Sequence, residues 1–325
     1  MARRVLTIHE LTFREKGKRE GVGREFAPSD LLGDDLLELF YTWVAGLTES
    51  DTADPGTHTW VTVNNVFKYA SRVLVVETSV GTSGESGEVV DSETGRTEFQ
   101  LSSRHAPTGI TRTVLLVPER GRSAFLMSEW SRRGSGGSRI RQLFVKHSTE
   151  NLGLIKMDCH TVSEGEAWAE HAKLKEVELR VEGRPVDVAD GPDIQVGIIS
   201  HVARPPRRGF FPRDLIGQLI RDKDAAKRVV GLPTEATTER EDVYITLVEG
   251  QRQKKFLLDG GGAPSFRLVL NEDGSDPLST SEIVAKCVEQ LAEIAGRTGK
   301  VEWDPRWSKQ LKEKRGENLS MAHSE

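Results

Sequence analysis

The sequence predicts an α+β protein with mostly antiparallel sheets, a packed N-terminal helix, a mid-chain helix and a C-terminal amphipathic helix. Short apolar or alternating runs follow one another along the chain, each bounded by Gly, Pro, Ser or Asp, which favours successive antiparallel strands. Three longer segments instead place apolar residues three and four positions apart, as amphipathic helices do. A chain of 325 residues with 36% hydrophobic and 29% charged residues can bury a large core and still carry long solvated loops.

The first part of the chain opens with an alternating strand at residues 4–13. A dense pattern of Leu, Phe and Trp then predicts a helix over residues 29–47 that packs into the core. The next apolar and β-branched runs predict strands, with a Gly/Ser/acid-rich loop or hairpin tip at residues 80–96. These strands span residues 58–66, 71–78 and 97–101.

Residues 111–147, TRTVLLVPERGRSAFLMSEWSRRGSGGSRIRQLFVKH, combine a strand, a turn, a second strand, a basic glycine-rich loop and a helix. The apolar runs VLLV and AFLM predict the strands, and Ser138 has the side chain of a helix N-cap. We expect the loop to have almost no fixed side-chain packing. Its glycines Gly134, Gly136 and Gly137 would let backbone N–H groups approach an anion at the start of the helix.

Residues 183–192, GRPVDVADGP, have the composition of a linker, which predicts a domain boundary there. We therefore expect one unit at residues 1–185, a second at residues 186–300 and a polar tail at residues 301–325. The first unit is expected to end with a strand at 152–159, a helix at 163–172 opened by a capping box, and a strand at 175–182. The second is expected to contain strands at 194–202, 242–249, 254–259 and 266–270 and helices at 212–230 and 276–295.

The sequence lacks the motifs of several protein classes, and their absence excludes those classes. No apolar run approaches 18 residues and the N-terminus has no apolar signal-peptide core, so we expect a cytoplasmic protein without membrane insertion. Cys159 and Cys287 lie far apart without a neighbouring cysteine, which excludes a disulfide framework and a cysteine zinc site. No P-loop, G-x-G-x-x-G, H-E-x-x-H or G-x-S-x-G motif occurs. We therefore expect no cofactor and favour a non-enzymatic function.

Positive charge is concentrated in two stretches of an otherwise acidic chain. Residues 111–147 carry eight Lys or Arg against two acids, and residues 204–228 carry eight against three. The whole chain has a net charge of −5, so everything outside the two stretches sums to −16. Arginine dominates over lysine, and its guanidinium fork matches phosphate oxygens better than an ammonium group does.

We therefore predict a protein that binds nucleic acid by neutralising phosphates and releasing counterions. A protein of this kind could serve in genome defence or in a mobile element. The expected contacts are the basic residues of the two loops, namely Arg132, Arg133, Arg139, Arg141, Lys146, Arg204, Arg207, Arg208 and Arg213. Phe210 and Phe211, which adjoin the second set, have the side chains needed for base stacking. The alternative for these two residues is a hydrophobic staple that packs the next helix.

Two other functions fit the same sequence. A metal-dependent phosphodiesterase or nuclease needs carboxylates and a lysine that converge on a sheet edge, and Glu249, Asp259 and Lys255 flank one predicted hairpin. A protein-interaction subunit would use its basic loops to dock an acidic partner protein, or would form a homo-oligomer. A third interpretation is structural: the loops are solvated, and their charges pair with acids elsewhere in the chain.

Overall fold

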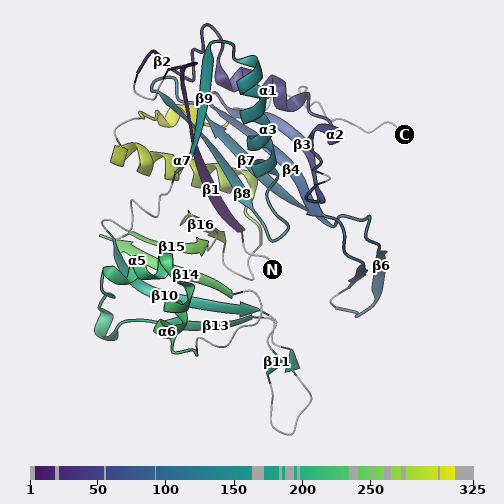
Figure 1. The fold of residues 1–325 in the computed structure, drawn as a ribbon, viewed down its shortest axis with the longest axis vertical. Coiled ribbons are helices and arrows are strands. Elements are labelled where there is room, and N and C mark those ends of the chain that lie inside the picture. Colours follow the sequence, from purple (N-terminus) through teal and green to yellow (C-terminus); the bar gives the residue numbers. More distant parts are fainter. Residues whose placement is uncertain are drawn as a thin grey trace. The chain divides into compact units, whose positions relative to one another are not determined.

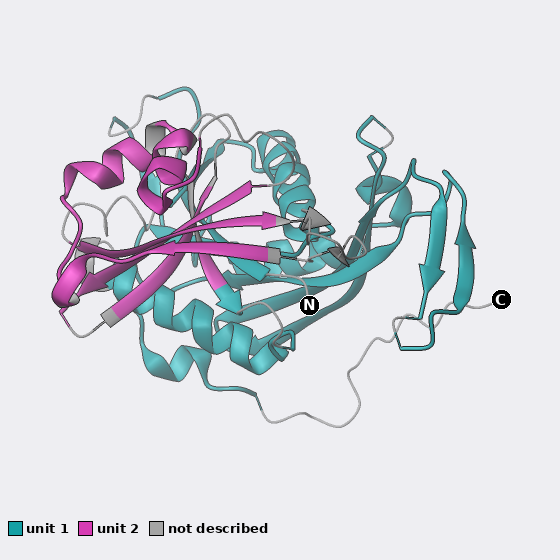
Figure 2. Ribbon diagram, turned by 90° about the horizontal axis from the view of Figure 1, so that it is seen from below, with its two compact units in different colours: residues 1–162, 270–325 teal, residues 163–269 magenta. Residues whose placement is uncertain are grey.

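In the computed structural model the chain divides into two compact units (Figure 1, Figure 2). Unit 1 comprises Met1–Val162 and Leu270–Glu325, and unit 2 comprises Ser163–Val269, so unit 2 is inserted into the sequence of unit 1. Both contain antiparallel strands with packed helices, which confirms the predicted α+β class. The structure describes residues 4–18, 22–54, 56–91, 93–162, 172–182, 185–186, 194–195, 198–233, 241–250, 252–259, 265–271, 276–298 and 301–311.

Strand β1 (Arg4–Glu15) is central to unit 1 because it pairs on both of its edges. Its residues 9–12 pair with β8 (Ser123–Trp130) on one edge and with β9 (Ile155–Thr161) on the other. From β8 the antiparallel sheet continues through β7, β4 and β3, which span Thr108–Leu116, Val73–Thr82 and Thr59–Ala70. The two-residue strand β2 (Glu25–Phe26) also pairs with β1.

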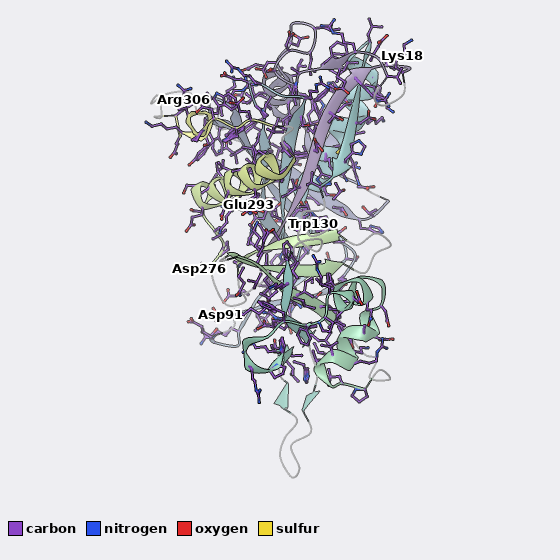
Figure 3. The ribbon with its side chains drawn as sticks, turned by 90° about the vertical axis from the view of Figure 1, so that its left-hand side faces the viewer. Lys18, Asp91, Trp130, Asp276, Glu293 and Arg306 are labelled. Carbon is purple, nitrogen blue, oxygen red and sulfur yellow. The ribbon has the colours of Figure 1, made fainter. Side chains whose placement is uncertain are left out.

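A separate two-stranded hairpin connects β4 to β7 and projects away from the main sheet in Figure 1. It consists of β5 (Gly87–Val90) and β6 (Thr97–Leu101), which agrees with the hairpin expected at residues 80–101. Its turn is closed by Asp91, which is labelled in Figure 3. The Asp91 carboxylate accepts hydrogen bonds from the backbone N–H groups of Glu93 and Thr94, at 2.9 and 2.7 Å.

One face of the main sheet of unit 1 is covered by helices α1 (Leu36–Ala45) and α3 (Gly136–Asn151), with the short α2 (Glu49–Thr52) beside them. Phe40 of α1 meets Phe144 of α3 edge to face, with ring centroids 4.7 Å apart. Both rings belong to the same buried cluster as Leu74 and Leu115 of the sheet. The apolar spacing that predicted these helices therefore supplies the core of the unit.

The N-terminal helix begins at Leu36 instead of at residue 29. Leu32 (φ +61°) and Gly33 (φ +106°) lie in the left-handed region of backbone conformation, which a right-handed helix does not contain. Asp35 caps the helix by accepting a hydrogen bond from the backbone N–H of Leu37 at 2.9 Å. Arg72 Nη1 lies 2.5 Å from the same carboxylate and fixes it in place.

Helix α7 (Thr280–Thr298) packs on the opposite face of the same sheet. On β7, Thr111 and Thr113 face α3, so the intervening Arg112 points to the other side. The Arg112 guanidinium donates to Thr280 Oγ1 at 3.0 Å and to the Leu278 carbonyl at 3.2 Å, which anchors the start of α7.

A fully buried carboxylate, that of Glu129 on β8, lies next to this anchor. Glu129 accepts hydrogen bonds from Arg4 Nη1 at 2.5 Å and from the Arg112 backbone N–H at 3.0 Å. Arg112 Nη1 lies 3.6 Å from the same carboxylate. One buried negative charge is therefore shared by two arginines, and they connect β1, β7 and β8.

Residues 301–311, which we expected to belong to a polar tail, pack within unit 1. Val301 is buried and forms a β-bridge with Gly121, and the Leu311 N–H donates to the Tyr69 carbonyl at 3.0 Å. Between them lies the 3-10 helix η2 (Pro305–Ser308), whose Trp307 backbone carbonyl accepts a hydrogen bond from the Arg72 N–H. The described part of the predicted tail thus belongs to the folded unit.

Unit 2 is an antiparallel sheet with two helices on one face. Its strands follow the order β13, β10, β14, β15 and β16, with bounds Ile198–Ala203, Lys173–Glu182, Glu241–Glu249, Arg252–Asp259 and Ser265–Asn271. The last two residues of β16 belong to unit 1. The expected helix over residues 212–230 is two helices, α5 (Asp214–Arg221) and α6 (Lys223–Val230). They break at Asp222, which adopts an extended conformation and caps α6 through a hydrogen bond from the Asp224 N–H at 2.9 Å. A small pair, β11 (Pro185–Val186) and β12 (Ile194–Gln195), and the 3-10 helix η1 (Pro206–Arg208) complete the described elements.

Other expectations from the sequence concern domain limits and membrane insertion. Apart from Ala172, the helix expected at residues 163–172 lies outside the described residues. The boundary drawn at residues 185/186 stays a prediction, while the contacts group β10 with the strands that follow it in unit 2. Within the described part of the chain, no helix combines the length and the apolarity needed to cross a membrane.

Candidate nucleic-acid interface

Arg132 and Arg133 occupy the tip of a closed turn between β8 and α3. The Ser131 N–H donates to the Gly134 carbonyl at 3.0 Å, and the Gly134 N–H donates to the Ser131 carbonyl at 3.1 Å. Gly134 has φ +108°, a conformation that glycine adopts without steric cost. Both arginine side chains are exposed. The turn therefore carries two consecutive exposed arginines on a hydrogen-bonded backbone.

Helix α3 begins at Gly136, because its N-cap residue is Ser135 and not Ser138, the N-cap that the sequence predicted. The Gly136 N–H donates to Thr111 Oγ1 at 3.2 Å, so it is directed at the sheet. A Cβ atom on Gly136 would lie 2.6 Å from the Cβ of Thr78, which is a steric overlap. The expectation that this N–H group approaches an anion is therefore wrong.

Gly137 makes an equally close approach to the sheet. A Cβ atom at this position would overlap the hydroxyl oxygens of Thr113 and Ser128, and the Ser128 Cβ would be 2.7 Å away. Both side chains are buried, and neither hydroxyl has a hydrogen-bond partner within the described structure. The glycine pair serves helix–sheet packing, so the expected absence of fixed packing is wrong from Ser135 onward.

Arg139 is used inside the unit, where it holds the segment that follows α2. Its Nε donates to the Thr52 carbonyl at 3.0 Å and its Nη2 donates to the Ala53 carbonyl at 2.9 Å. Its Nη1 lies 3.7 Å from the Asp54 carboxylate. These contacts occupy much of the set of N–H donors with which the guanidinium would otherwise bind a phosphate.

Arg141 is half-buried, and its Nε atom has no hydrogen-bond partner among the described residues. Its positive charge acts to lower the pKa of two neighbouring groups, His9 and Cys159. Burial is the larger effect on Cys159 and raises the pKa of its thiol. Arg141 therefore contributes to the interior of unit 1, and the thiol beside it is not activated as a nucleophile.

The His9 imidazole makes the stability of unit 1 depend on pH. Burial, reinforced by Arg141 and opposed by a backbone hydrogen bond to Leu126, lowers the pKa of His9 from 6.5 to about 4. The unfolded chain binds this proton at a higher pH than the folded chain does. The stability that the neutral His9 contributes is therefore fully present above pH 6.5 and is lost as the pH falls toward 4. We expect the free energy of unfolding to fall by roughly 1–2 kcal/mol from pH 7 to pH 5 on account of His9. Urea titrations at both pH values check this, and a His9→Gln variant with the full wild-type pH dependence would contradict it.

Lys146 is exposed on α3, ten residues beyond the first residue of the helix. At 1.5 Å per residue it lies about 15 Å farther along the helix axis. The first basic loop thus brings two of its five predicted contacts together, Arg132 and Arg133. Lys146 is displaced from them, and Arg139 and Arg141 make internal contacts.

The second basic loop, residues 203–213, belongs to unit 2. Arg204 is largely exposed, but its Nε donates to Glu176 Oε2 at 2.6 Å. Arg207 and Arg213 are exposed, and Arg207 has a left-handed backbone conformation (φ +54°). The Arg208 side chain lies outside the described residues. This loop therefore presents cations at the surface of unit 2, whereas the first loop belongs to unit 1.

The two phenylalanines of the second loop differ in their surroundings. Phe211 packs against the hydrophobic core of unit 2, and its N–H donates to the Leu174 carbonyl at 2.9 Å. Phe210 is 42% exposed, with Lys173 Nζ 5.1 Å from its ring centroid. Phe211 therefore fits the hydrophobic-staple alternative, whereas Phe210 keeps an exposed ring beside a cation.

The residues of the nuclease alternative do not converge. Glu249 pairs with Arg252 at the closed end of the β14–β15 hairpin, whereas Asp259 is the last residue of β15. Seven residues of strand separate Arg252 from Asp259, or about 23 Å, which is too far for ligands of one metal ion. Lys255 pairs instead with the buried Glu178. Among the residues that the structure describes, no group of three or more His, Cys, Asp or Glu could hold a metal ion.

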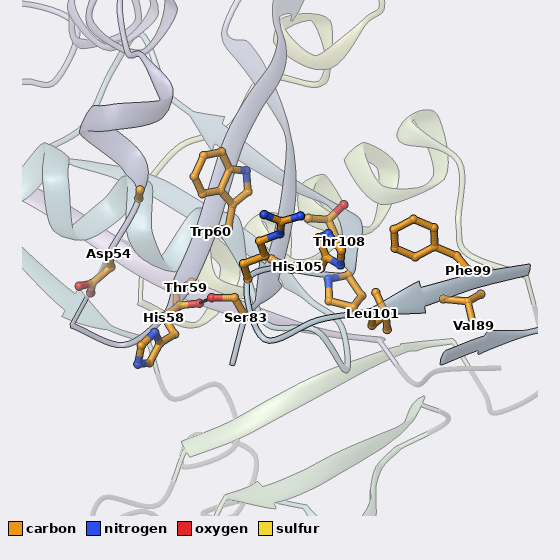
Figure 4. A pocket seen from close by; sticks show the side chains of 14 residues that line it. Asp54, His58, Thr59, Trp60, Ser83, Val89, Phe99, Leu101, His105 and Thr108 are labelled. Carbon is orange, nitrogen blue, oxygen red and sulfur yellow. Dashed lines mark hydrogen bonds between the residues drawn. The ribbon is translucent and has the colours of Figure 1, made fainter. Parts of the chain in front are cut away.

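A pocket of about 840 Å³ lies beside the first basic loop, and sequence reasoning did not identify it (Figure 4). Five segments form it: the turn after α2, residues 58–60 at the start of β3, Ser83 after β4, the β5–β6 hairpin and residues 104–108. Its lining includes Asp54, His58, Trp60, Ser83, Phe99 and His105. Its sequence signal is weak, consisting of single aromatic residues within the polar segments HTW and TEFQ.

Two arginines of the first basic stretch contact residues that line this pocket. Arg133 Nη1 donates to the carbonyl of Pro107, a lining residue, at 2.8 Å. Arg139 Nη2 donates to the carbonyl of Ala53, another lining residue, at 2.9 Å. No protein-family model, curated protein or solved structure matches the chain.

Proposed function

We propose that the protein binds nucleic acid without acting on it chemically, and that Arg132 and Arg133 make its principal phosphate contacts. The observation that supports this most strongly is the closed turn that carries these two consecutive, exposed arginines. A guanidinium group donates two parallel hydrogen bonds to a phosphate. Because the turn is already closed by its own hydrogen bonds, little conformational entropy is lost when it binds.

Exposed cations of unit 2 provide a second, independent set of contacts. Arg204, Arg207 and Arg213 are exposed on the loop that also carries the exposed ring of Phe210. The interface we propose is smaller than composition implied, because Arg139 and Arg141 are used inside unit 1. We therefore expect moderate affinity with a clear dependence on salt concentration.

The test is a fluorescence-anisotropy titration with single-stranded and duplex DNA and RNA at several salt concentrations. Each phosphate neutralised adds about 0.9 to the slope of log affinity against log salt for duplex DNA. The double variant Arg132→Glu and Arg133→Glu should weaken binding to every nucleic acid and reduce this slope by about 2.

The matched control is the double variant Arg120→Glu and Arg122→Glu. Both residues are exposed and come from the same basic stretch, but they precede β8, whereas Arg132 and Arg133 follow it. The eight residues of β8 separate the two pairs by about 26 Å. Equal losses in both double variants would contradict a specific role for the turn. The absence of binding by the wild-type protein at low salt would overturn the proposed function.

A further inference from the structure

We infer that the pocket beside the first basic loop holds an unpaired base, so that the protein prefers single strands to duplexes. This inference rests on the proposed function, because Arg133 of the phosphate-binding turn also contacts the pocket wall. Figure 4 shows Trp60 and Phe99 on either side of His105, with the β5–β6 hairpin supplying Phe99. A volume of about 840 Å³ falls within the usual range for small-molecule pockets.

The rings that line the pocket are unusually accessible. Trp60 is 40% exposed and Phe99 is 51% exposed, although large aromatic side chains normally lie mostly buried. The Phe99 and His105 ring centroids are 5.2 Å apart, so these two rings already contact each other. Exposed aromatic faces stack on any base, and stacking on side chains requires bases that are not already stacked within a duplex.

The polar atoms of two of these rings have defined roles. The Trp60 Nε1–H donates to Thr62 Oγ1 at 3.0 Å, so this side chain offers the pocket an apolar ring. The Nδ1 of His105 accepts a hydrogen bond from the Ser102 N–H at 3.0 Å. The neutral imidazole therefore carries its proton on Nε2, which makes Nε2 a donor for the carbonyl oxygens or ring nitrogens of a base.

The charges at the rim fit a phosphate backbone. Arg104 is exposed and lines the pocket, and Arg133 lies across the start of β7, with its Cδ 3.1 Å from the position that a Cβ of Gly109 would take. The acidic lining residue Asp54 is near Arg139, with 3.7 Å between carboxylate and guanidinium, which offsets its negative charge. Cations at the rim and aromatic rings within form the combination that single-strand sites use.

The experiment measures the affinity of the whole protein for a short labelled oligothymidine and for a duplex of the same length, with the variants Trp60→Ala and Phe99→Ala. Loss of one stacking ring should weaken single-strand binding about 5- to 150-fold and leave duplex binding unchanged. Trp60→Phe, which keeps a ring, should restore most of the affinity. Leu154→Ala is the control, since it removes a 73% exposed apolar side chain that does not line the pocket and should leave the single-strand preference unchanged.

The outcomes separate this inference from the proposed function. Wild-type binding that disappears in the Arg132→Glu, Arg133→Glu variant but persists unchanged in Trp60→Ala and Phe99→Ala overturns the pocket inference and leaves the proposed function standing. Equal losses for single strands and duplexes in these two variants also overturn it. If the wild-type protein binds no nucleic acid, both proposals fail. Because Trp60 and Phe99 are exposed, their truncation should leave the thermal unfolding of the protein unchanged, which provides a check on folding.

Discussion

Replacing Gly137 by alanine is expected to lower the free energy of unfolding of unit 1 by about 3 kcal/mol. The added methyl group would overlap the Thr113 and Ser128 hydroxyls, so α3 would have to move away from the sheet. At an ordinary helix position the same change stabilises a protein by about 1 kcal/mol, because alanine is the better helix former. The sign of the effect therefore distinguishes a packing role of Gly137 from an ordinary helical one.

Urea unfolding followed by tryptophan emission measures this effect, because five of the six tryptophans belong to unit 1. The matched test is partial rescue. Changing Thr113 and Ser128 to alanine removes both hydroxyls that the new methyl group would meet, and neither hydroxyl has a hydrogen-bond partner among the residues that the structure describes. Gly137→Ala should therefore cost less in that background. A stabilising effect of Gly137→Ala in the wild-type background would contradict the packing described here.

Replacing Glu129 by alanine is expected to lower the free energy of unfolding by about 3–5 kcal/mol. The Glu129 side chain is fully buried, and Arg4 and Arg112 both direct guanidinium groups at it. Removing the carboxylate takes away the buried charge that Arg4 and Arg112 share and leaves Arg112 with the half-buried Glu77, whose Oε1 lies 3.3 Å from the Arg112 Nε. Loss of a buried charge beside two cations is far more costly than loss of one surface ion pair. Glu129→Gln keeps the shape and one acceptor oxygen, so its effect should be smaller.

The matched control is Glu38→Ala. Glu38 pairs with Lys68 at 2.6 Å, a distance close to that of the Arg4–Glu129 pair, but both side chains are well exposed. The exposed pair should contribute about 0–1 kcal/mol. Similar losses in Glu38→Ala and Glu129→Ala, measured by the same urea titration, would show that burial does not govern the strength of these pairs.

Much of the fold was predictable because its signals are local. The strands of the first half and the hairpin of β14 and β15 follow apolar or alternating runs bounded by turn residues, and the structure places strands there. Helix boundaries were less predictable, since they depend on single backbone conformations. The positive φ of Leu32 delays the start of α1, and the extended Asp222 divides the mid-chain helix.

The candidate site was less predictable because it depends on contacts between distant segments. Arg132 and Arg139 belong to the same basic stretch, yet one lies on an exposed turn and the other binds carbonyl oxygens of residues 52 and 53. Gly137 is required by the hydroxyls of two sheet residues, Thr113 and Ser128, that no local pattern connects with it. The pocket joins residues from five segments, and a single exposed Trp60 or Phe99 has no significance in the sequence until both are known to line the same pocket.

The insertion of unit 2 into unit 1 has a consequence for the order in which a ribosome-bound chain can fold. Residues 163–269 emerge together, so unit 2 can complete its sheet while unit 1 still lacks α7, which covers one face of its sheet. At about 5–20 residues per second, roughly 7–27 s pass between the synthesis of β9 and the end of α7. During that interval the face that α7 will cover is open to solvent and to chaperones. The unit that begins first along the chain is therefore the last to be completed.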